Sequence, residues 1–220
     1  MRKIRIYPEE KLHQIWKKWL AATKYCYNEA IAYLRKHGKV SKYDLRKLIV
    51  RNSPDWVKEC PYNPKGEAVL DAHKAFFDSL CSGTKQSNAG RFRSCRDAKR
   101  TINFQPENYS NGTWYPYLVK GLEFKASESL PTADIEVKIK QKDKSFKTAI
   151  RCNSWNASTQ LVYDKKRWFA IFPEEFIPEV SDKQTMIALD PGVRSFLTGF
   201  DGEKFVEICN GDITKIYRLC

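Results

Sequence analysis

The sequence predicts an α+β fold, in which a helical domain is inserted into an antiparallel β-barrel or sandwich and another β-rich domain begins near the end. Between residues 8 and 83, apolar residues recur at three- and four-residue spacing, which is typical of amphipathic helices. From Gly90 onward, apolar residues alternate in short runs separated by Gly, Asn, Asp and Pro, which is typical of strands. These runs follow one another too closely for crossover helices, which favours antiparallel pairing.

The first residues predict a strand that precedes the helices. Residues 2–7, RKIRIY, alternate basic and apolar side chains, as in a half-buried strand with a cationic outer face. We expect this strand to join the later barrel, which makes the helical segment an insertion between its first two strands. The expected domains are therefore a barrel of residues 1–7 and 90–180 and a helical domain of residues 8–89.

Three helices are expected in the insertion. The first follows Pro8 and an acidic pair and ends at Gly38, because Pro and carboxylates favour a helix start and Gly favours its end. The second begins at Ser41 with Asp44 in a near capping box, and the third covers residues 67–83. The Pro-rich stretch 54–66 is expected to be a loop. Aromatic residues at helical spacing are assigned to the core: Trp16, Trp19, Tyr27 and Phe76.

Composition indicates a globular protein that binds a phosphate-rich partner. The chain has 220 residues, of which 42% are hydrophobic and 30% charged. This composition is sufficient for a packed core and is not typical of a disordered chain. Its formal net charge is +13. Such an excess of cations is the electrostatic footprint of a partner rich in phosphate, above all nucleic acid.

Cysteine usage and hydropathy indicate an intracellular, reducing compartment. The seven cysteines are odd in number and form no C-x-x-C pair, which argues against a disulfide framework and a zinc site. The three histidines lie far apart, and each is expected to pack or face solvent. No signal peptide or membrane-spanning run is expected, and nuclear and cytoplasmic locations are not distinguished.

The stretch IALDPGVRSFLTGFDG, residues 187–202, places a carboxylate at the end of an apolar strand. One reading is a hairpin whose turn begins with Asp190, since Asp, Pro and Gly are ordinary turn residues. The other reading is a metal ligand held at a strand tip. The runs MIALD, SFLTGF and KFVEIC are expected to form a three-strand meander, and residues 172–184 to form a linker before it.

Residues 187–202 resemble the first RuvC motif of the TnpB-type nucleases of bacterial transposons, and the wording DPGVR is especially similar to the eukaryotic and viral Fanzor proteins. Further similar segments occur in the family's order: KIRIYP, YCYNEAIAYLR, LDAHKAFF, FRSCRDAKRTINF and, at the end, GDITKIYRLC, which looks like the start of the bridging helix. The resemblance covers nearly the whole chain in architecture. It is specific at residues 187–202 and loose elsewhere.

The resemblance implies a wedge barrel, an inserted helical recognition domain, and, in residues 186–220, the first strands of an RNase H-like RuvC domain. It implies a guide RNA, recognition of a short DNA element beside the target, and DNA cleavage with two Mg²⁺ ions held by carboxylates. Asp190 is the expected metal ligand and catalytic residue.

The family's further carboxylates and its zinc ribbon lie downstream of the first motif. Asp201 is expected to be a turn residue, Glu207 to point outward from its strand, and Asp212 to cap a helix. One carboxylate does not make a two-metal site. The chain alone is therefore expected to be inactive and to be completed by a C-terminal half or a second chain, without zinc in this segment.

Two groups of residues are expected to contact nucleic acid. The polar faces of the helices carry the candidates for the DNA element, and the basic runs carry the candidates for RNA. Two other functions stay open, a catalytically inactive relic that still binds nucleic acid and a plain basic structural protein. The candidate residues are Lys24, Asn28, Lys65 and Lys74 for DNA, and Arg91, Arg93, Arg96, Lys99, Arg100, Lys138, Lys140, Lys142 and Lys144 for RNA.

Overall fold

The computed structural model describes residues 1–140, 146–174, 188–190, 197–200 and 204–208. The chain divides into two compact units, Met1–Glu175 and Phe176–Cys220, and each is described by itself. Both contain antiparallel strands, and the first also contains the helices, so the predicted α+β class is confirmed. Among the helices of the described part, none is long and apolar enough to cross a membrane.

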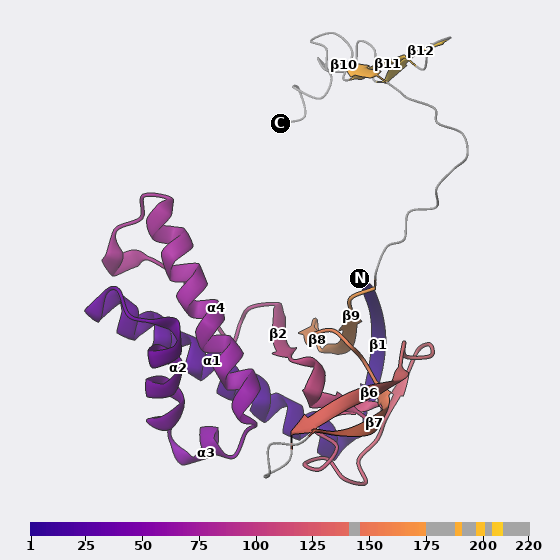
Figure 1. Ribbon diagram of the computed structural model, residues 1–220. Helices are drawn as coiled ribbons and strands as arrows, with labels where there is room; N and C mark the ends of the chain where they lie inside the picture. The colour runs from indigo at the N-terminus through magenta and orange to yellow at the C-terminus, as the bar shows by residue number, and fades with distance from the viewer. Residues whose placement is uncertain (141–145, 175–187, 191–196, 201–203, 209–220) are drawn as a thin grey trace. The chain divides into compact units, whose positions relative to one another are not determined.

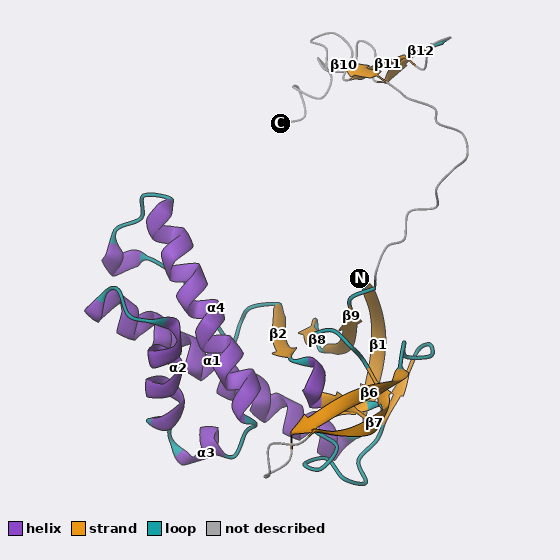
Figure 2. Ribbon diagram, in the orientation of Figure 1, coloured by secondary structure: helices purple, strands orange, loops and turns teal. Residues whose placement is uncertain are grey.

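Four α-helices follow the first strand. They are α1 (Glu10–His37), α2 (Lys42–Arg51), α3 (Asp55–Lys58) and α4 (Tyr62–Cys81). Figures 1 and 2 show α1 running from the strands to the other helices, so that it belongs to both parts of the unit. The helix α1 ends as predicted at Gly38, whose φ of 75° is left-handed backbone that glycine adopts readily.

Two expectations about the helices are wrong. Residues 54–66 are not a loop, because they contain α3 and the first turn of α4. Pro64 is tolerated there, since the amide hydrogens of a first helical turn have no helical partner. The side chain of Ser41 makes no capping hydrogen bond, so the near capping box does not form.

The strand β1 (Arg2–Pro8) joins the main sheet, as predicted. The sheet has the order β2-β8-β9-β1-β5, and each pair in it is antiparallel. Its other strands are β2 (Lys99–Phe104), β5 (Phe124–Ala126), β8 (Thr159–Asp164) and β9 (Arg167–Phe172). The helices therefore lie between β1 and β2 in the chain. In the described residues β2 and β5 are the two edges of this sheet, and no closed barrel is formed.

Smaller strand pairs complete the described strands. In the first unit β3 (Tyr109–Ser110) pairs with β4 (Thr113–Trp114), and β6 (Ala133–Lys140) with β7 (Phe146–Ser154). Residues 112–124 were expected to be a β-rich run, but between β4 and β5 they form turns, with Tyr115 at a φ of 54°.

The second unit contains the predicted three-strand meander. Its strands are β10 (Ala188–Asp190), β11 (Leu197–Phe200) and β12 (Phe205–Ile208), in the antiparallel order β10-β11-β12. Asp190 is the last residue of β10 and pairs with Thr198. The expected linker at residues 172–184 falls largely outside the described residues, as do Asp201 and Asp212.

An aromatic cluster joins α1 to the sheet. Trp16 is fully buried, with ring centroids 5.3 Å from Trp168, 5.6 Å from Phe124 and 5.7 Å from Trp114. The Nε1–H of Trp114 donates to Thr159 Oγ1 at 2.9 Å, which satisfies a polar group inside the core. The core assignments made from helical spacing are confirmed, since all four predicted aromatic residues are buried: Trp16, Trp19, Tyr27 and Phe76.

Candidate nucleic-acid interface

The residues between α4 and β2 form a loop that lies along α1. Within this loop, Gly90 has a φ of 69°, and a Cβ there would lie within 2.5 Å of Ile31 Cδ1 of α1. Gly90 thus meets two conditions that favour glycine, left-handed backbone and close approach. After this point the loop carries RFRSCRDA, residues 91–98, and β2 begins at Lys99.

Arg35 of α1 fixes the start of the loop. Its guanidinium donates to three successive carbonyl oxygens, those of Asn88 (3.2 Å), Ala89 (3.0 Å) and Gly90. The same group lies 4.4 Å from the centre of the Phe92 ring, in a cation–π contact. Sequence reasoning missed this residue because an arginine in the last turn of a helix is explained by the helix dipole alone.

Asn28 of α1 fixes the middle of the loop. Its amide donates to the carbonyl oxygen of Arg93 at 2.9 Å and accepts from the N–H of Arg93 at 2.8 Å. Both groups of the side chain are therefore used inside the protein. Asn28 therefore positions the loop, and its contact with DNA stays a prediction.

Arg93 is held by its side chain as well. Its guanidinium lies 3.8 Å from the centre of the Tyr27 ring and forms an ion pair of 3.2 Å with Asp71 of α4. Asp71 also accepts from the Asn103 amide at 3.2 Å, so it links the loop and β2 to α4. We therefore assign Arg93 to the structure of the loop rather than to its free surface.

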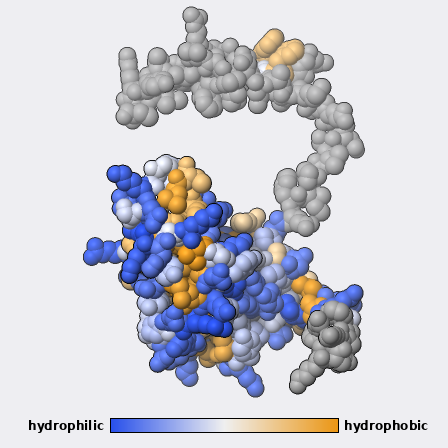
Figure 3. Space-filling view, turned by 60° about the vertical axis from the view of Figure 1, so that its left-hand side comes forward, coloured by the Kyte–Doolittle hydropathy of each residue, from blue (hydrophilic) through white to orange (hydrophobic). Residues whose placement is uncertain are grey.

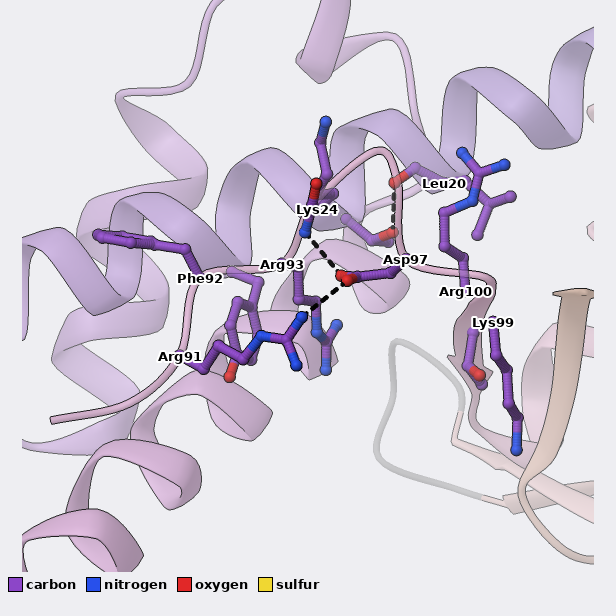
Figure 4. Close-up of a pocket in the computed structure, with 12 residues that line it drawn as sticks. Leu20, Lys24, Arg91, Phe92, Arg93, Asp97, Lys99 and Arg100 are labelled. Atoms are coloured by element: carbon purple, nitrogen blue, oxygen red, sulfur yellow. Dashed lines mark hydrogen bonds and ion pairs between the residues drawn. The ribbon is translucent and has the colours of Figure 1, made fainter.

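A pocket of about 340 Å³ opens between this loop and α1. Figure 4 shows Leu20 and Lys24 reaching it from α1, while the other labelled residues come from the loop and the start of β2. Five cations and one carboxylate line it. They are Lys24, Arg91, Arg93, Lys99, Arg100 and Asp97; the other lining residues are Leu20, Thr23, Tyr27, Phe92, Ser94 and Thr101. We call it the basic pocket.

Asp97, the carboxylate of the basic pocket, is already engaged. It accepts from the Ser94 N–H at 2.6 Å and from the Arg91 guanidinium at 3.1 Å. Arg91 nevertheless keeps 85% of its side chain exposed, so its other N–H groups can bind a ligand. The surplus of positive charge in the basic pocket therefore faces solvent.

Lys24 of α1 and Arg100 of β2 both line the basic pocket. The ammonium of Lys24 donates to the exposed thiol of Cys95, and this hydrogen bond lowers the pKa of Cys95. Arg100 lies 4.8 Å from the centre of the Tyr163 ring of β8. Lys99 and Arg100 are the first residues of β2 after the loop, so a sheet strand positions both.

Among the remaining candidates from the sequence, the expectation that Lys65 contacts DNA is corrected. It is 3% exposed, and its ammonium donates to the carbonyl oxygens of Val57 (2.8 Å) and Lys58 (3.4 Å) at the end of α3. Desolvation by burial lowers its pKa. Lys65 therefore stabilises the α3–α4 connection and has no free surface with which to contact DNA.

The other candidates lie away from the basic pocket or outside the described residues. Lys74 of α4, Arg96 of the loop and Lys138 of β6 are exposed, and none of them lines the pocket. Lys142, Lys144 and the side chain of Lys140 lie outside the described residues, as do the side chains of Asp190 and Glu207.

In the part of the chain that the structure describes, no three His, Cys, Asp or Glu side chains are grouped so as to hold a metal ion. The histidines have packing contacts: His13 accepts from Trp168 Nε1–H at 3.0 Å, a ring nitrogen of His73 lies 3.0 Å from the Val40 carbonyl, and His37 stacks on Tyr33.

In comparisons with known proteins, no protein-family model matches the chain, and no curated protein does either.

Proposed function

We propose that the chain binds RNA through the basic pocket and forms the N-terminal part of an RNA-guided DNA endonuclease. The observation that carries the RNA-binding part is the convergence of four further cations beside the structural Arg93 on one pocket whose single carboxylate is already paired: Lys24 from α1, Arg91 from the loop, and Lys99 and Arg100 from β2. The exposed ring of Phe92 beside these cations suits a nucleic acid better than a small anion.

The endonuclease part of the proposal concerns the second unit. Asp190 ends the first of three antiparallel strands, which is the position expected from the resemblance to the first RuvC motif. The sheet β2-β8-β9-β1-β5 is assigned to the wedge domain and α1–α4 to the recognition domain of such a nuclease. A guide RNA and a target DNA are the partners in this proposal.

The cofactor in this proposal is Mg²⁺, and Asp190 is its ligand from this chain. Carboxylate oxygen is a ligand that Mg²⁺ prefers, and a strand end is a rigid support for it. When bound between carboxylates, a pair of such ions activates water and stabilises the leaving oxygen of a phosphodiester. As the resemblance implies, the further carboxylates in this proposal come from a C-terminal part or a second chain.

A second candidate function is nucleic-acid binding without cleavage, as in an inactive relic of a transposon protein. The basic pocket serves this function equally well, since it needs no metal. The two candidates differ only in the role of Asp190.

The test has two stages. First, RNA that co-purifies with the chain is identified and sequenced; recovery of no RNA under low-salt conditions contradicts the RNA-binding part. Second, cleavage is measured with RNA, Mg²⁺ and a C-terminal part supplied on the same chain or in trans. Asp190→Ala is expected to abolish cleavage while leaving RNA affinity and melting temperature nearly unchanged. Full cleavage by the alanine variant would show that Asp190 is an ordinary turn residue and no metal ligand. No cleavage by any assembly favours the second candidate, nucleic-acid binding without cleavage.

A further inference from the structure

A second hollow, of about 180 Å³, lies between α1 and α2. Its α1 wall consists of Tyr25, Glu29 and Tyr33, which are spaced four residues apart and therefore share one helix face. Leu48, Ile49 and Asn52 form its α2 wall. We call it the aromatic groove. It shares no residue with the basic pocket.

Trp56 of α3 extends the aromatic groove. Its ring meets Tyr25 edge-on, with centroids 5.6 Å apart and planes at 70°, and 46% of the residue is exposed. Tyr33 in turn stacks on His37 at 4.3 Å. Tyr25 and Tyr33 of α1 and Trp56 of α3 are thus held by packing while part of their surface stays accessible. On the helical side of the unit, Figure 3 shows hydrophobic residues in a narrow band with hydrophilic ones around it.

Glu29 places a carboxylate between the two tyrosines of the α1 wall. It is exposed, and no Lys, Arg or His of the described residues lies within ion-pair distance of it. Burial and then the charge of Glu29 raise the pKa of Tyr25. Burying this carboxylate under an apolar peptide side chain would be unfavourable, because it would lose water without gaining donors. A ligand of the aromatic groove must therefore bring N–H donors.

The helix α2 also carries two exposed cations close in sequence to the groove. Lys47 and Arg51 are both exposed and lie next in sequence to the wall residues Leu48 and Asn52. Aromatic rings, a carboxylate acceptor and neighbouring cations together fit a nucleotide, whose base has flat faces and edge donors and whose phosphates are anionic.

We propose that the aromatic groove binds one unpaired guanine of an RNA strand. Guanine carries two adjacent donors, N1–H and the 2-amino group, on its pairing edge, and both can donate to the two oxygens of Glu29. Adenine has one donor, the 6-amino group, beside the N1 acceptor, and uracil has one donor, N3–H, between two carbonyl oxygens, so neither base can donate to both oxygens of Glu29. The base lies against Tyr25 and Trp56, and its phosphates contact Lys47 and Arg51. The proposal rests on the proposed function only in taking RNA as the ligand.

The test compares seven-residue RNAs that differ in the central base. Binding of the full chain to U₃GU₃, U₃IU₃, U₃AU₃ and U₇ is measured by fluorescence anisotropy. We expect the guanine oligomer to bind about tenfold more tightly than the adenine one, because a bidentate contact discriminates by that order. Inosine, which lacks the 2-amino group, is expected to fall between them. Equal affinities for all four RNAs overturn the proposal.

Variants assign the preference to the groove. Glu29→Gln is expected to remove the guanine preference and leave the affinity for U₇ unchanged, whereas Glu123→Gln, at an exposed carboxylate elsewhere, is expected to keep the preference. Trp56→Ala is expected to weaken binding of U₃GU₃ several-fold, and Tyr117→Ala, at another exposed ring, to change nothing. A guanine preference that survives Glu29→Gln overturns the assignment.

The outcomes separate this inference from the proposed function. If no RNA binds in a salt-sensitive manner, the RNA-binding function fails. If RNA binds with a steep salt dependence but without base preference, only the guanine site fails. The molar mass of the chain and of Trp56→Ala is measured in parallel by light scattering. A dimer that Trp56→Ala converts to a monomer, with RNA affinity unchanged, makes the groove a contact between two copies and overturns the guanine site.

Discussion

Two regions of the helix α1 differ in what their side chains contact. Near its start, Trp16 is buried among aromatic rings of the sheet, and its packing stabilises the fold. Further along, Asn28 and Arg35 donate to the backbone of the loop before β2 and leave the cations of that loop facing solvent. One helix thus anchors the core with apolar side chains and shapes a charged surface with polar ones. Stability and binding are therefore expected to respond to different substitutions.

The largest expected effect is at Trp16. Trp16→Ala removes a buried aromatic side chain and leaves a cavity, so the free energy of unfolding is expected to fall by about 3–5 kcal/mol. Urea denaturation measures this, with Trp16→Phe as the smaller-cavity control. RNA affinity of the folded fraction is expected to stay the same. A loss of affinity without a loss of stability would mean that Trp16 lies in the binding surface.

The second prediction contrasts two lysines of α4 that the sequence placed in the same group. Lys65→Ala removes the hydrogen bonds from a buried ammonium to the carbonyl groups of Val57 and Lys58, which is expected to lower the unfolding free energy by about 1–3 kcal/mol. Lys74→Ala changes an exposed side chain and is expected to have an effect below about 0.5 kcal/mol. Thermal and urea unfolding of both variants measure the difference. Equal stability of the two variants would contradict the structural role of Lys65.

The third prediction concerns the alkaline side of the stability curve. Burial raises the pKa of the Cys26 thiol from its ordinary value near 9 to about 12. The unfolded chain therefore loses this proton first, so the stability is present below pH 9 and is lost as the pH rises toward 12. At pH 10 the loss is about 1 kcal/mol.

The measurement compares pH profiles of unfolding free energy between pH 8 and pH 10.5. Cys26→Ala is expected to show a flatter decline than the parent chain, while Cys81→Ala, at an exposed thiol, keeps the parent slope. Identical slopes for all three proteins would show that Cys26 ionises as easily in the folded chain as in the unfolded one.

Hydrophobic spacing predicted the strand β1, the helices α1 and α4, and the core aromatic residues, because burial on one face imposes a period on the sequence. The meander β10–β12 was predicted for the same reason. Spacing could not predict α3 or the first turn of α4, since the two prolines near Lys65 are typical of loops as well as of helix starts.

The candidate site was predicted in part. The basic run 91–100 could be recognised from its charge, but its pairing to α1 depends on contacts between residues more than fifty positions apart, such as Arg35 with Ala89 and Asn28 with Arg93. Charge also could not separate Lys65, whose ammonium is buried against carbonyl groups, from an exposed lysine. Tertiary contacts decide these cases, and single residues in a sequence do not encode them locally.

The salt dependence of RNA binding tests the central claim most directly. Affinity of the chain for a U₁₅ RNA is measured from low to moderate salt, for the parent and for a variant in which Arg91, Lys99 and Arg100 are changed to Gln. Each phosphate contact contributes a log–log slope of about −0.7, so losing three is expected to make the slope shallower by about 2. A control changes Lys11, Lys120 and Lys125, exposed lysines elsewhere, and is expected to keep the parent slope. Equal slopes for the two triple variants would contradict the assignment of RNA to the basic pocket.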